Sequence, residues 1–301
     1  MHSSRARFLV ALLAALCLLA YAAACSKGVD DADDAEGSGD DSAEVANLTP
    51  YKPNPAQEGS IAGTISYAGA APEKAPIAMT ADPVCAAANP DPHSEDIVVN
   101  GDKLQNVLVY IKEGKVGDKN FSGFSFAPGS QPATLDQHGC HYVPHVQAVQ
   151  VNQTLNITNS DQTSHNINFD AKLNEKFNQG QGPQAAPISK PLKRAEVVVP
   201  VKCNQHPWMR AYVAVLPHPF FAITDANGKF EIKNVPAGTY TLVAWHEKDQ
   251  KGVTQTVTVT AGGAATSDFS FSADQLKAEN TQGGALRMMP ALEFPMLGME
   301  H

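Results

Sequence analysis

The chain has 301 residues and a formal net charge of −9 at pH 7, with 18% charged residues. This acidity excludes nucleic acid as the expected partner, because contacts with a phosphate backbone need clustered Lys and Arg. Much of the negative charge lies between residues 30 and 44.

The N-terminus has the features of a secretory signal. Arg5 and Arg7 precede an apolar stretch over residues 8–19, which is short for a membrane span, and three alanines stand directly before Cys25. This arrangement resembles a bacterial lipoprotein signal. The resemblance implies that residues 1–24 are removed and that Cys25 is acylated. Plain secretion, with Cys25 as a bystander, is the alternative.

Residues 25–58 contain nine Asp and Glu residues, eight of them within 30–44 among Ala, Gly and Ser, with few apolar side chains to bury. Such a composition predicts a disordered acidic tether. Together with an acylated Cys25, it predicts an exported lipoprotein of the cell envelope, held to a membrane by its lipid and facing the periplasm or located in the outer membrane.

From residue 59 onward the pattern predicts an all-β fold. Runs rich in β-branched residues alternate with polar positions and end at Gly, Pro and Asn-Gly signals, and no long stretch has helical periodicity. The expected strands cover residues 60–67, 105–112, 145–151, 154–159, 165–169, 196–202, 211–216, 220–224, 229–233, 238–246 and 253–260.

The segment 222–242 contains two turn signals, Asn227-Gly228 and Pro236-Ala-Gly238, between alternating apolar residues. With the Gly-x-Ile-x-Gly strand at 59–63 and the valine-rich strand at 106–110, it resembles the carboxypeptidase-regulatory-like, or transthyretin-like, β-sandwich. The resemblance implies one discontinuous sandwich from residues 59–126 and 218–272. The roughly 100 residues between are too many for a loop and predict an inserted domain at 127–217.

The last residues, 273–301, contain Gly-Gly, Pro and scattered methionines. They predict an irregular tail. Its methionines are either loosely packed apolar residues or soft copper ligands.

Three candidate metal ligands lie on one short loop between two valine-rich strands: Cys203, His206 and Met209. A thiolate, imidazoles and a weak thioether suit an ion that alternates between Cu(I) and Cu(II). His165 is the candidate fourth ligand, because it follows Asn159-Ser-Asp161 and begins an alternating run. The alternative is a metal-free protein in which Cys203 and Met209 serve only in packing.

The Cys-x-x-His-Pro-Trp-Met loop and the Asn-Ser-Asp…His-Asn segment resemble the plastocyanin and azurin family, and more closely bacterial cupredoxins that have this loop. The resemblance covers residues 144–217 and implies a cupredoxin Greek-key sandwich with one mononuclear copper ion. Its ligands would be His165, Cys203, His206 and an axial Met209, and Asn166 would brace the ligand loop. The His-x-x-Met spacing is shorter than in plastocyanins.

The cysteine count fits this interpretation. Of five cysteines, Cys17 leaves with the signal, Cys25 takes the lipid and Cys203 binds the metal, so Cys85 and Cys140 remain to pair as a disulfide. The alternative is a zinc site from Cys140, His141 and His145, although the paired-cysteine spacing of structural zinc sites is absent.

A four-ligand site without an open position predicts one-electron transfer to a redox partner protein and no enzymatic activity. We expect His206 to be the route for the electron. Pro207 and Trp208 either form a docking patch or pack against the neighbouring sandwich. Two other functions remain open, namely copper storage or delivery, and a structural or glycan-binding role of the transthyretin-like part.

Overall fold

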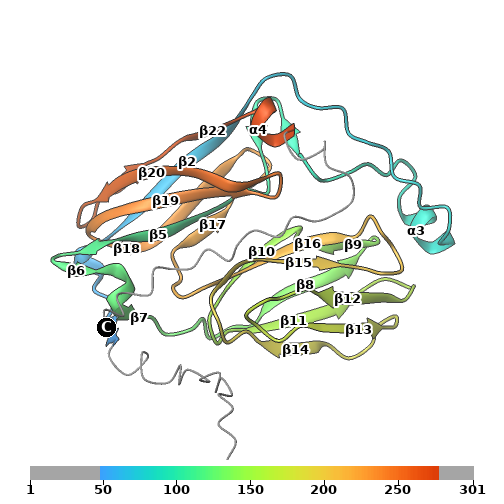
Figure 1. Ribbon diagram of the computed structural model, residues 1–301, viewed down its shortest axis with the longest axis horizontal. Helices are drawn as coiled ribbons and strands as arrows, with labels where there is room; N and C mark the ends of the chain where they lie inside the picture. Colours follow the sequence, from blue (N-terminus) through green and yellow to red (C-terminus); the bar gives the residue numbers. More distant parts are fainter. Residues whose placement is uncertain (1–47, 278–301) are drawn as a thin grey trace, which may run out of the picture. The chain divides into compact units, whose positions relative to one another are not determined.

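The structure is a computed structural model that describes residues 48–277. These residues form two β-sandwiches (Figure 1), which confirms the predicted all-β class. The predicted signal, Cys25, most of the tether and most of the tail lie outside the described residues. In the described part of the chain, no helix is long and apolar enough to cross a membrane.

The inserted sandwich, residues 133–216, has two sheets. The first has the strand order β10-β16-β15-β12-β13, in which β10 and β16 run parallel. The second has the order β14-β11-β8-β9. The strand bounds are β8 Ala133–His138, β9 His141–Val143, β10 Val146–Gln150, β11 Thr154–Asn159, β12 His165–Phe169, β13 Phe177–Gln181, β14 Ile188–Pro191, β15 Glu196–Lys202 and β16 Arg210–Leu216.

The outer sandwich combines strands from before and after the insertion. One sheet has the order β17-β5-β19-β20 with β6 beside β5, and the other has the order β18-β2-β4-β3 with β21 and β22 beside β2. The strand bounds are β2 Glu58–Ala68, β3 Val99–Asn100, β4 Lys103–Leu104, β5 Leu108–Val116, β6 Lys119–Asn120, β17 Phe221–Ile223, β18 Lys229–Pro236, β19 Gly238–His246, β20 Asp249–Val259, β21 Ala264–Thr266 and β22 Phe269–Ser272.

The Asn227-Gly228 turn between β17 and β18 shows why glycine is needed there. Gly228 has φ +65°, and a Cβ at this position would lie 2.6 Å from the carbonyl oxygen of Ile65. The Asp225 carboxylate accepts hydrogen bonds from the backbone N–H groups of Asn227 and Lys229, which closes the turn. Any side chain at position 228 would therefore be strained and would also push β2 away.

Two ends of the predicted domains differ in the structure. Residues 48–57, assigned above to the disordered tether, contain β1 (Thr49–Pro50), which pairs with β7 (Phe124–Ser125), and the 3-10 helix η1 (Pro55–Gln57). The predicted irregular tail begins with the helix α4 (Ala273–Lys277), and a second 3-10 helix, η2, covers Phe121–Gly123. Short elements of this length have too little periodicity to be recognised from sequence.

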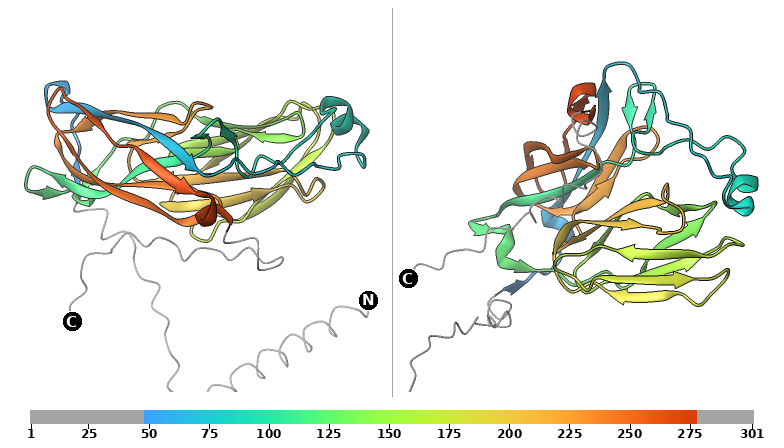
Figure 2. Two further views of the ribbon diagram at one scale, coloured as in Figure 1. Left: turned by 90° about the horizontal axis from the view of Figure 1, so that it is seen from above. Right: turned by 45° about the vertical axis from the view of Figure 1, so that its right-hand side comes forward.

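The segment between β2 and β3, residues 69–98, is called the cap segment here. It was expected within the outer sandwich, but its helix α3 (Pro83–Ala88) lies beside the inserted sandwich (Figure 2). The Cys85–Cys140 disulfide joins α3 to the β8–β9 turn. Asp82 is the N-cap of α3 and accepts hydrogen bonds from the amides of Val84 and Cys85. The cap segment therefore belongs partly to the core of the inserted sandwich, which includes Met79 and Cys85.

Each sandwich has its own apolar core, and a third buried cluster lies between them. Leu108 and Tyr110 of β5 and Trp245 of β19 contribute to this cluster from the outer sandwich, and Val146 and Leu216 contribute from the inserted one. Because the residues that join the sandwiches are fully or almost fully buried, burial of apolar surface stabilises their association.

A buried histidine near the junction makes the stability depend on pH. His218 donates from Nε2 to the carbonyl oxygen of Ile111 (2.8 Å) and packs against Phe121 and Phe220, and burial lowers its pKa from 6.5 to about 4. Between these pH values the unfolded chain binds more protons than the folded chain, so stability is present above pH 6.5 and is lost as the pH falls toward 4.

We expect His218 to account for about 3 kcal/mol of this acid-induced loss of unfolding free energy. Chemical denaturation of His218→Gln at several pH values should show a correspondingly flatter dependence between pH 4 and 6.5. His138→Gln, at an exposed position, is the matched control and should follow the unmodified chain. An equally steep dependence in His218→Gln would contradict the assignment.

Candidate metal centre

The ligand loop connects β15 to β16, and backbone hydrogen bonds close it. The N–H of Cys203 donates to the carbonyl oxygen of Met209 (3.1 Å), and the N–H of Met209 donates to that of His206 (2.9 Å). His165 is the first residue of β12, which pairs with β15 in the same sheet. The sheet thus brings a distant histidine beside the loop.

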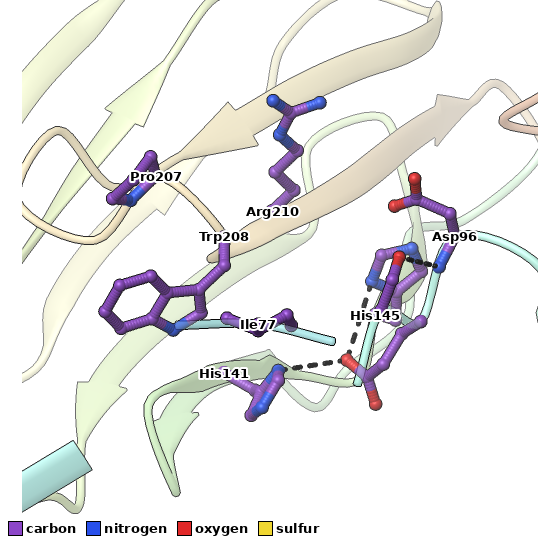
Figure 3. A pocket seen from close by; sticks show the side chains of 9 residues that line it. Ile77, Asp96, His141, His145, Pro207, Trp208 and Arg210 are labelled. Atoms are coloured by element: carbon purple, nitrogen blue, oxygen red, sulfur yellow. Dashed lines mark hydrogen bonds and ion pairs between the residues drawn. The ribbon is translucent and has the colours of Figure 1, made fainter. Parts of the chain in front are cut away.

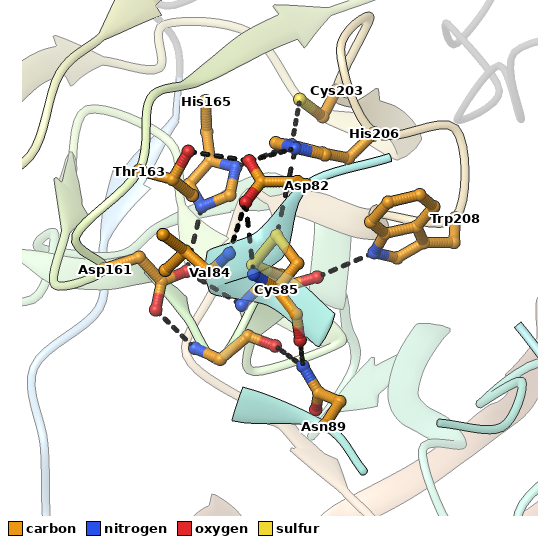
Figure 4. The surroundings of a disulfide bond; sticks show 12 residues. Asp82, Val84, Cys85, Asn89, Asp161, Thr163, His165, Cys203, His206 and Trp208 are labelled. Carbon is orange, nitrogen blue, oxygen red and sulfur yellow. Dashed lines mark hydrogen bonds and ion pairs between the residues drawn. A yellow bond between two sulfur atoms is a disulfide. The ribbon is translucent and has the colours of Figure 1, made fainter. Parts of the chain in front are cut away.

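Three of the four predicted ligands converge on one point (Figure 4). The Nδ1 atoms of His165 and His206 are 2.9 Å apart, and the Sγ atom of Cys203 is 3.6 Å from Nδ1 of His206. All three residues are buried, with exposed fractions of 0%, 2% and 5% for His165, Cys203 and His206. One ligand atom from each residue lies within 4.8 Å of those of the other two.

These separations fit a shared metal ion. Metal–nitrogen and metal–sulfur bonds of about 2.0–2.3 Å at tetrahedral angles separate the ligand atoms by roughly 3.3–3.6 Å. The sulfur–nitrogen distance of 3.6 Å lies in this range, and the nitrogen–nitrogen distance of 2.9 Å needs only a small separation of the two rings. A thiolate with two imidazoles in a buried site is a donor set that suits copper or zinc.

Two carboxylates hold the far nitrogen of each histidine. Nε2 of His165 is 2.8 Å from Oδ2 of Asp161, and Nε2 of His206 is 3.2 Å from Oδ2 of Asp82. A ring that donates from Nε2 to a carboxylate directs its Nδ1 lone pair elsewhere when it is neutral. Both Nδ1 atoms therefore lie on the side of Cys203 and are free to bind a metal ion, and orienting a ring in this way is the usual role of a carboxylate behind a metal-binding histidine.

Asp161 is itself held by the turn that contains the disulfide. Its carboxylate accepts hydrogen bonds from the backbone N–H groups of Gly139 (2.6 Å) and Cys140 (2.8 Å). Burial alone would raise the pKa of Asp161, but these hydrogen bonds and the one from His165 lower it. The carboxylate is therefore ionised and fixed before any metal binds.

The electrostatics of the ligands follow from the same contacts. Burial disfavours the charged form of His165, but hydrogen bonds with Asp161 and Cys203 outweigh it and raise its pKa to about 9. Burial lowers the pKa of His206. Burial alone would raise the pKa of the Cys203 thiol, but its contacts with His165 and the loop backbone lower it, which favours the thiolate that binds metals.

Asn166 lies beside the loop. Its Oδ1 accepts a hydrogen bond from the backbone N–H of Asn204 (2.6 Å) and lies 3.4 Å from Sγ of Cys203, and its Nδ2 donates to Asn178 of β13. Its side chain thus connects the ligand loop to β13, and its role in bracing a metal site stays a prediction. Met209 is fully buried at the end of the loop.

His206 was predicted to be the route for the electron, but the cap segment covers it and leaves it 5% exposed. Besides the bond to Asp82, its Nε2 lies 3.8 Å from Sγ of Cys85. Trp208 is half-buried, its ring centroid is 5.1 Å from that of His206, and its Nε1 donates to the carbonyl oxygen of Cys140. Trp208 is therefore the more exposed of the two rings.

Sequence reasoning missed Asp82 and the role of Asp161. The Asp82-Pro83 pair is a helix-start signal, with an N-cap aspartate before a proline in the first turn, and it could have predicted α3. Its position over His206 follows from the Cys85–Cys140 link, which no local pattern predicts. The sets Asp82-Cys85-His206 and Cys140-Asp161-His165 also cluster, but each contains a disulfide sulfur and surrounds the same site.

Removing the carboxylate behind His165 should weaken metal binding without removing a ligand. We expect Asp161→Asn to lower the affinity for copper by about 10- to 100-fold. Nε2 of His165 would lose its charged partner, and the imidazole would no longer be held in one tautomer. A competition titration with a chelator measures the change. Asp136→Asn, whose carboxylate accepts a hydrogen bond from Thr158 and belongs to none of the candidate ligand clusters, is the control. Equal affinities would contradict this role of Asp161.

The fold and site define the class: an all-β chain of two sandwiches, one of which holds a buried His-Cys-His site. The family model for the carboxypeptidase regulatory-like domain matches residues 190–272. In the structure, its first part forms β15 and β16 of the inserted sandwich and its remainder forms β17–β22 of the outer one. No curated protein matches the chain.

Solved copper proteins are among the similar structures. A Cu-containing nitrite reductase from Thermus scotoductus is 20% identical, with a TM-score of 0.27, over 34% of this chain and 24% of its own. A Cu(I) amicyanin mutant is 22% identical, with a TM-score of 0.25, over 29% of this chain and 84% of its own. A purple cupredoxin from Nitrosopumilus maritimus is 22% identical, with a TM-score of 0.24, over 28% of this chain and 98% of its own.

The chain thus spans about a quarter of the nitrite reductase chain, and all three TM-scores are below 0.5. The interpretation of the site therefore rests on its geometry.

Proposed function

We propose that this chain is a type 1 copper protein that transfers single electrons. The observation that carries the proposal is the convergence of two Nδ1 atoms and one cysteine sulfur at a buried point, with a carboxylate behind each histidine. Bound copper would supply a one-electron couple between Cu(I) and Cu(II). Met209, at the end of the same loop, is the proposed axial ligand.

The surroundings of the site support electron transfer over catalysis. The three ligands are nearly inaccessible to solvent, and Asp82, Asp161 and the disulfide occupy their outer sides. A substrate would have no open position at such an ion. A rigid site also suits electron transfer, because little rearrangement accompanies the change of oxidation state.

The proposed route to a partner protein runs through Trp208. Its ring lies against His206 and is half-buried, whereas His206 itself is 5% exposed. The exposed Pro207 stands beside it. A redox partner would therefore dock on the surface that Pro207 and Trp208 form, through the small and transient contact that redox encounters use.

We further propose that the protein acts in the cell envelope as a lipoprotein. The support is the N-terminal pattern that ends at Cys25, together with the disulfide between Cys85 and Cys140, which suits an oxidising compartment. Metabolic labelling with a fatty acid, compared between the unmodified chain and Cys25→Ser, tests the anchor. Equal labelling would contradict it.

A redox titration of the copper-loaded chain tests the proposed function. We expect one copper ion per chain and a reversible one-electron step, with the absorption of the oxidised form regained after each cycle. Copper that stays Cu(I) over the accessible range of potential would contradict electron transfer. That outcome would favour copper storage or delivery, the second candidate, which the cover over His206 also suits.

A further inference from the structure

A pocket of about 210 Å³ lies beside the ligand loop (Figure 3), and His165, Cys203 and His206 do not line it. Trp208 and Arg210 line it from the loop and β16, and Glu95 and Asp96 line it from the cap segment. Two histidines that the proposed function does not use complete the polar part of the wall. They are His141 of β9 and His145, two residues after β9.

His145 has one satisfied and one unsatisfied ring nitrogen. Its Nε2 is 2.9 Å from Oε1 of Glu247, and its Nδ1 has no hydrogen-bond partner although the side chain is only 8% exposed. The nearest carboxylate oxygen to Nδ1 is Oε2 of Glu95, at 4.0 Å. A buried nitrogen without a partner is costly, so a group that binds in front of it would remove this cost.

Glu95 lies between the two histidines. Its Oε2 is 3.2 Å from Nδ1 of His141 and 4.0 Å from Nδ1 of His145. The first distance is close to the roughly 3.3 Å that separates two ligands on a tetrahedral ion. The Glu95 side chain is 45% exposed, so it can move the remaining fraction of an ångström without disturbing the core.

Charges of both signs surround the pocket. The carboxylates of Glu95, Asp96 and Glu247 lie near Arg210 and Lys248, of which Lys248 is bound to Asp96 at 2.8 Å, and Lys74 acts on Glu95. With neutral histidines these charges balance, so a metal ion would be recognised by the geometry of its ligands and not by a net charge of the pocket. The pKa of Glu95 is lowered, chiefly by its hydrogen bond from His141, so its carboxylate is ionised at neutral pH.

We propose that this pocket is a second metal site, in which His141, His145 and Glu95 bind a divalent transition-metal ion such as Zn²⁺. Two imidazoles and one carboxylate are a common donor set for such ions, and water would complete the coordination. Nε2 of His145 remains bonded to Glu247, so this ligand would have a carboxylate behind it. The sequence had suggested zinc at Cys140, His141 and His145, but Cys140 is in the disulfide and Glu95 takes its place.

Equilibrium dialysis of the full chain against Zn²⁺ tests the site independently of copper. The background variant carries Cys203→Ser and His206→Ala, which removes two of the three ligands of the other centre. We expect this variant to retain one Zn²⁺ per chain. Added separately, His141→Ala and Glu95→Gln should each weaken Zn²⁺ binding at least 10-fold. Both side chains are partly exposed, so we expect both variants to fold, and a weaker affinity would then report the loss of a ligand.

His145→Ala should have the same or a larger effect. The matched control is His138→Ala, an exposed histidine that pairs with His141 across the β8–β9 hairpin and does not line the pocket. Absence of bound Zn²⁺ in the background variant would overturn the proposal. Retention of full affinity in both His141→Ala and Glu95→Gln would overturn it equally.

Discussion

Replacement of Cys203 by serine is expected to lower the affinity for copper by more than about 100-fold, beyond the 10- to 100-fold that loss of an outer partner costs. The thiol lies 3.6 Å from Nδ1 of His206 and interacts with His165, and its contacts already favour the thiolate. Serine occupies a similar volume but does not provide a soft anionic ligand. A chelator competition measures the loss.

Gln205→Ser is the control for this change, because residue 205 lies on the same loop and is exposed. It should leave the affinity for copper unchanged within about 3-fold, since single surface changes rarely exceed 0.5 kcal/mol. Cys203→Ser should also unfold at nearly the same denaturant concentration as the metal-free unmodified chain. Tight copper binding by Cys203→Ser would mean that the sulfur is not a ligand.

Removal of the disulfide has the largest expected effect on stability. Cys85 and Cys140 are 55 residues apart in sequence, and both are fully buried. A disulfide that closes a loop of that length lowers the conformational entropy of the unfolded chain and so stabilises the folded chain by roughly 4 kcal/mol. We therefore expect the double variant Cys85→Ser/Cys140→Ser to lose about this much unfolding free energy, measured by chemical denaturation.

The same change should free α3 from the β8–β9 turn and uncover His206, because Cys85 and Asp82 both lie against its Nε2. Faster modification of His206 by diethyl pyrocarbonate would report this opening. The unmodified chain treated with a reductant is the control and should match the double variant. A loss below about 1 kcal/mol would show that the link adds little to the packing of Met79 and Cys85.

Much of the fold could be predicted where apolar alternation is strong. The strands expected at 154–159, 165–169, 196–202 and 238–246 have the same bounds in the structure as β11, β12, β15 and β19. Each of them contributes buried residues to a core. In β11 and most of β15 burial alternates along the strand, as the sequence pattern does, whereas β12 and β19 are buried on both faces over part of their length.

The strands that were missed lack this signal. β13, Phe177–Gln181, is an edge strand with the sequence Phe-Asn-Gln-Gly-Gln and only one fully buried residue. Its pairing with β12 is made by backbone hydrogen bonds, which leave no mark on the side-chain pattern. β8 and β9 flank the disulfide turn, and they were missed because β8 is largely polar and β9 has only three residues.

The residues of the candidate copper site also fall into two groups, those that a local sequence pattern indicates and those that it does not. His165, Cys203 and His206 could be predicted because each belongs to a recognisable strand or loop motif. Asp82 could not, because it reaches the site from the cap segment, more than 80 residues before His165. The pocket of His141, His145 and Glu95 combines the same cap segment with a hairpin, so it too depends on a tertiary contact that local patterns do not contain.

The optical and electron-spin spectra of the oxidised, copper-loaded chain test the central claim most directly. A cysteine thiolate and two histidine Nδ1 atoms on one Cu(II) ion predict an intense thiolate-to-copper band in the visible range and the spin signal of a single copper. The band should be missing in Cys203→Ser. A colourless protein that binds copper only as Cu(I), or a Cu(II) signal without the visible band, would contradict the account.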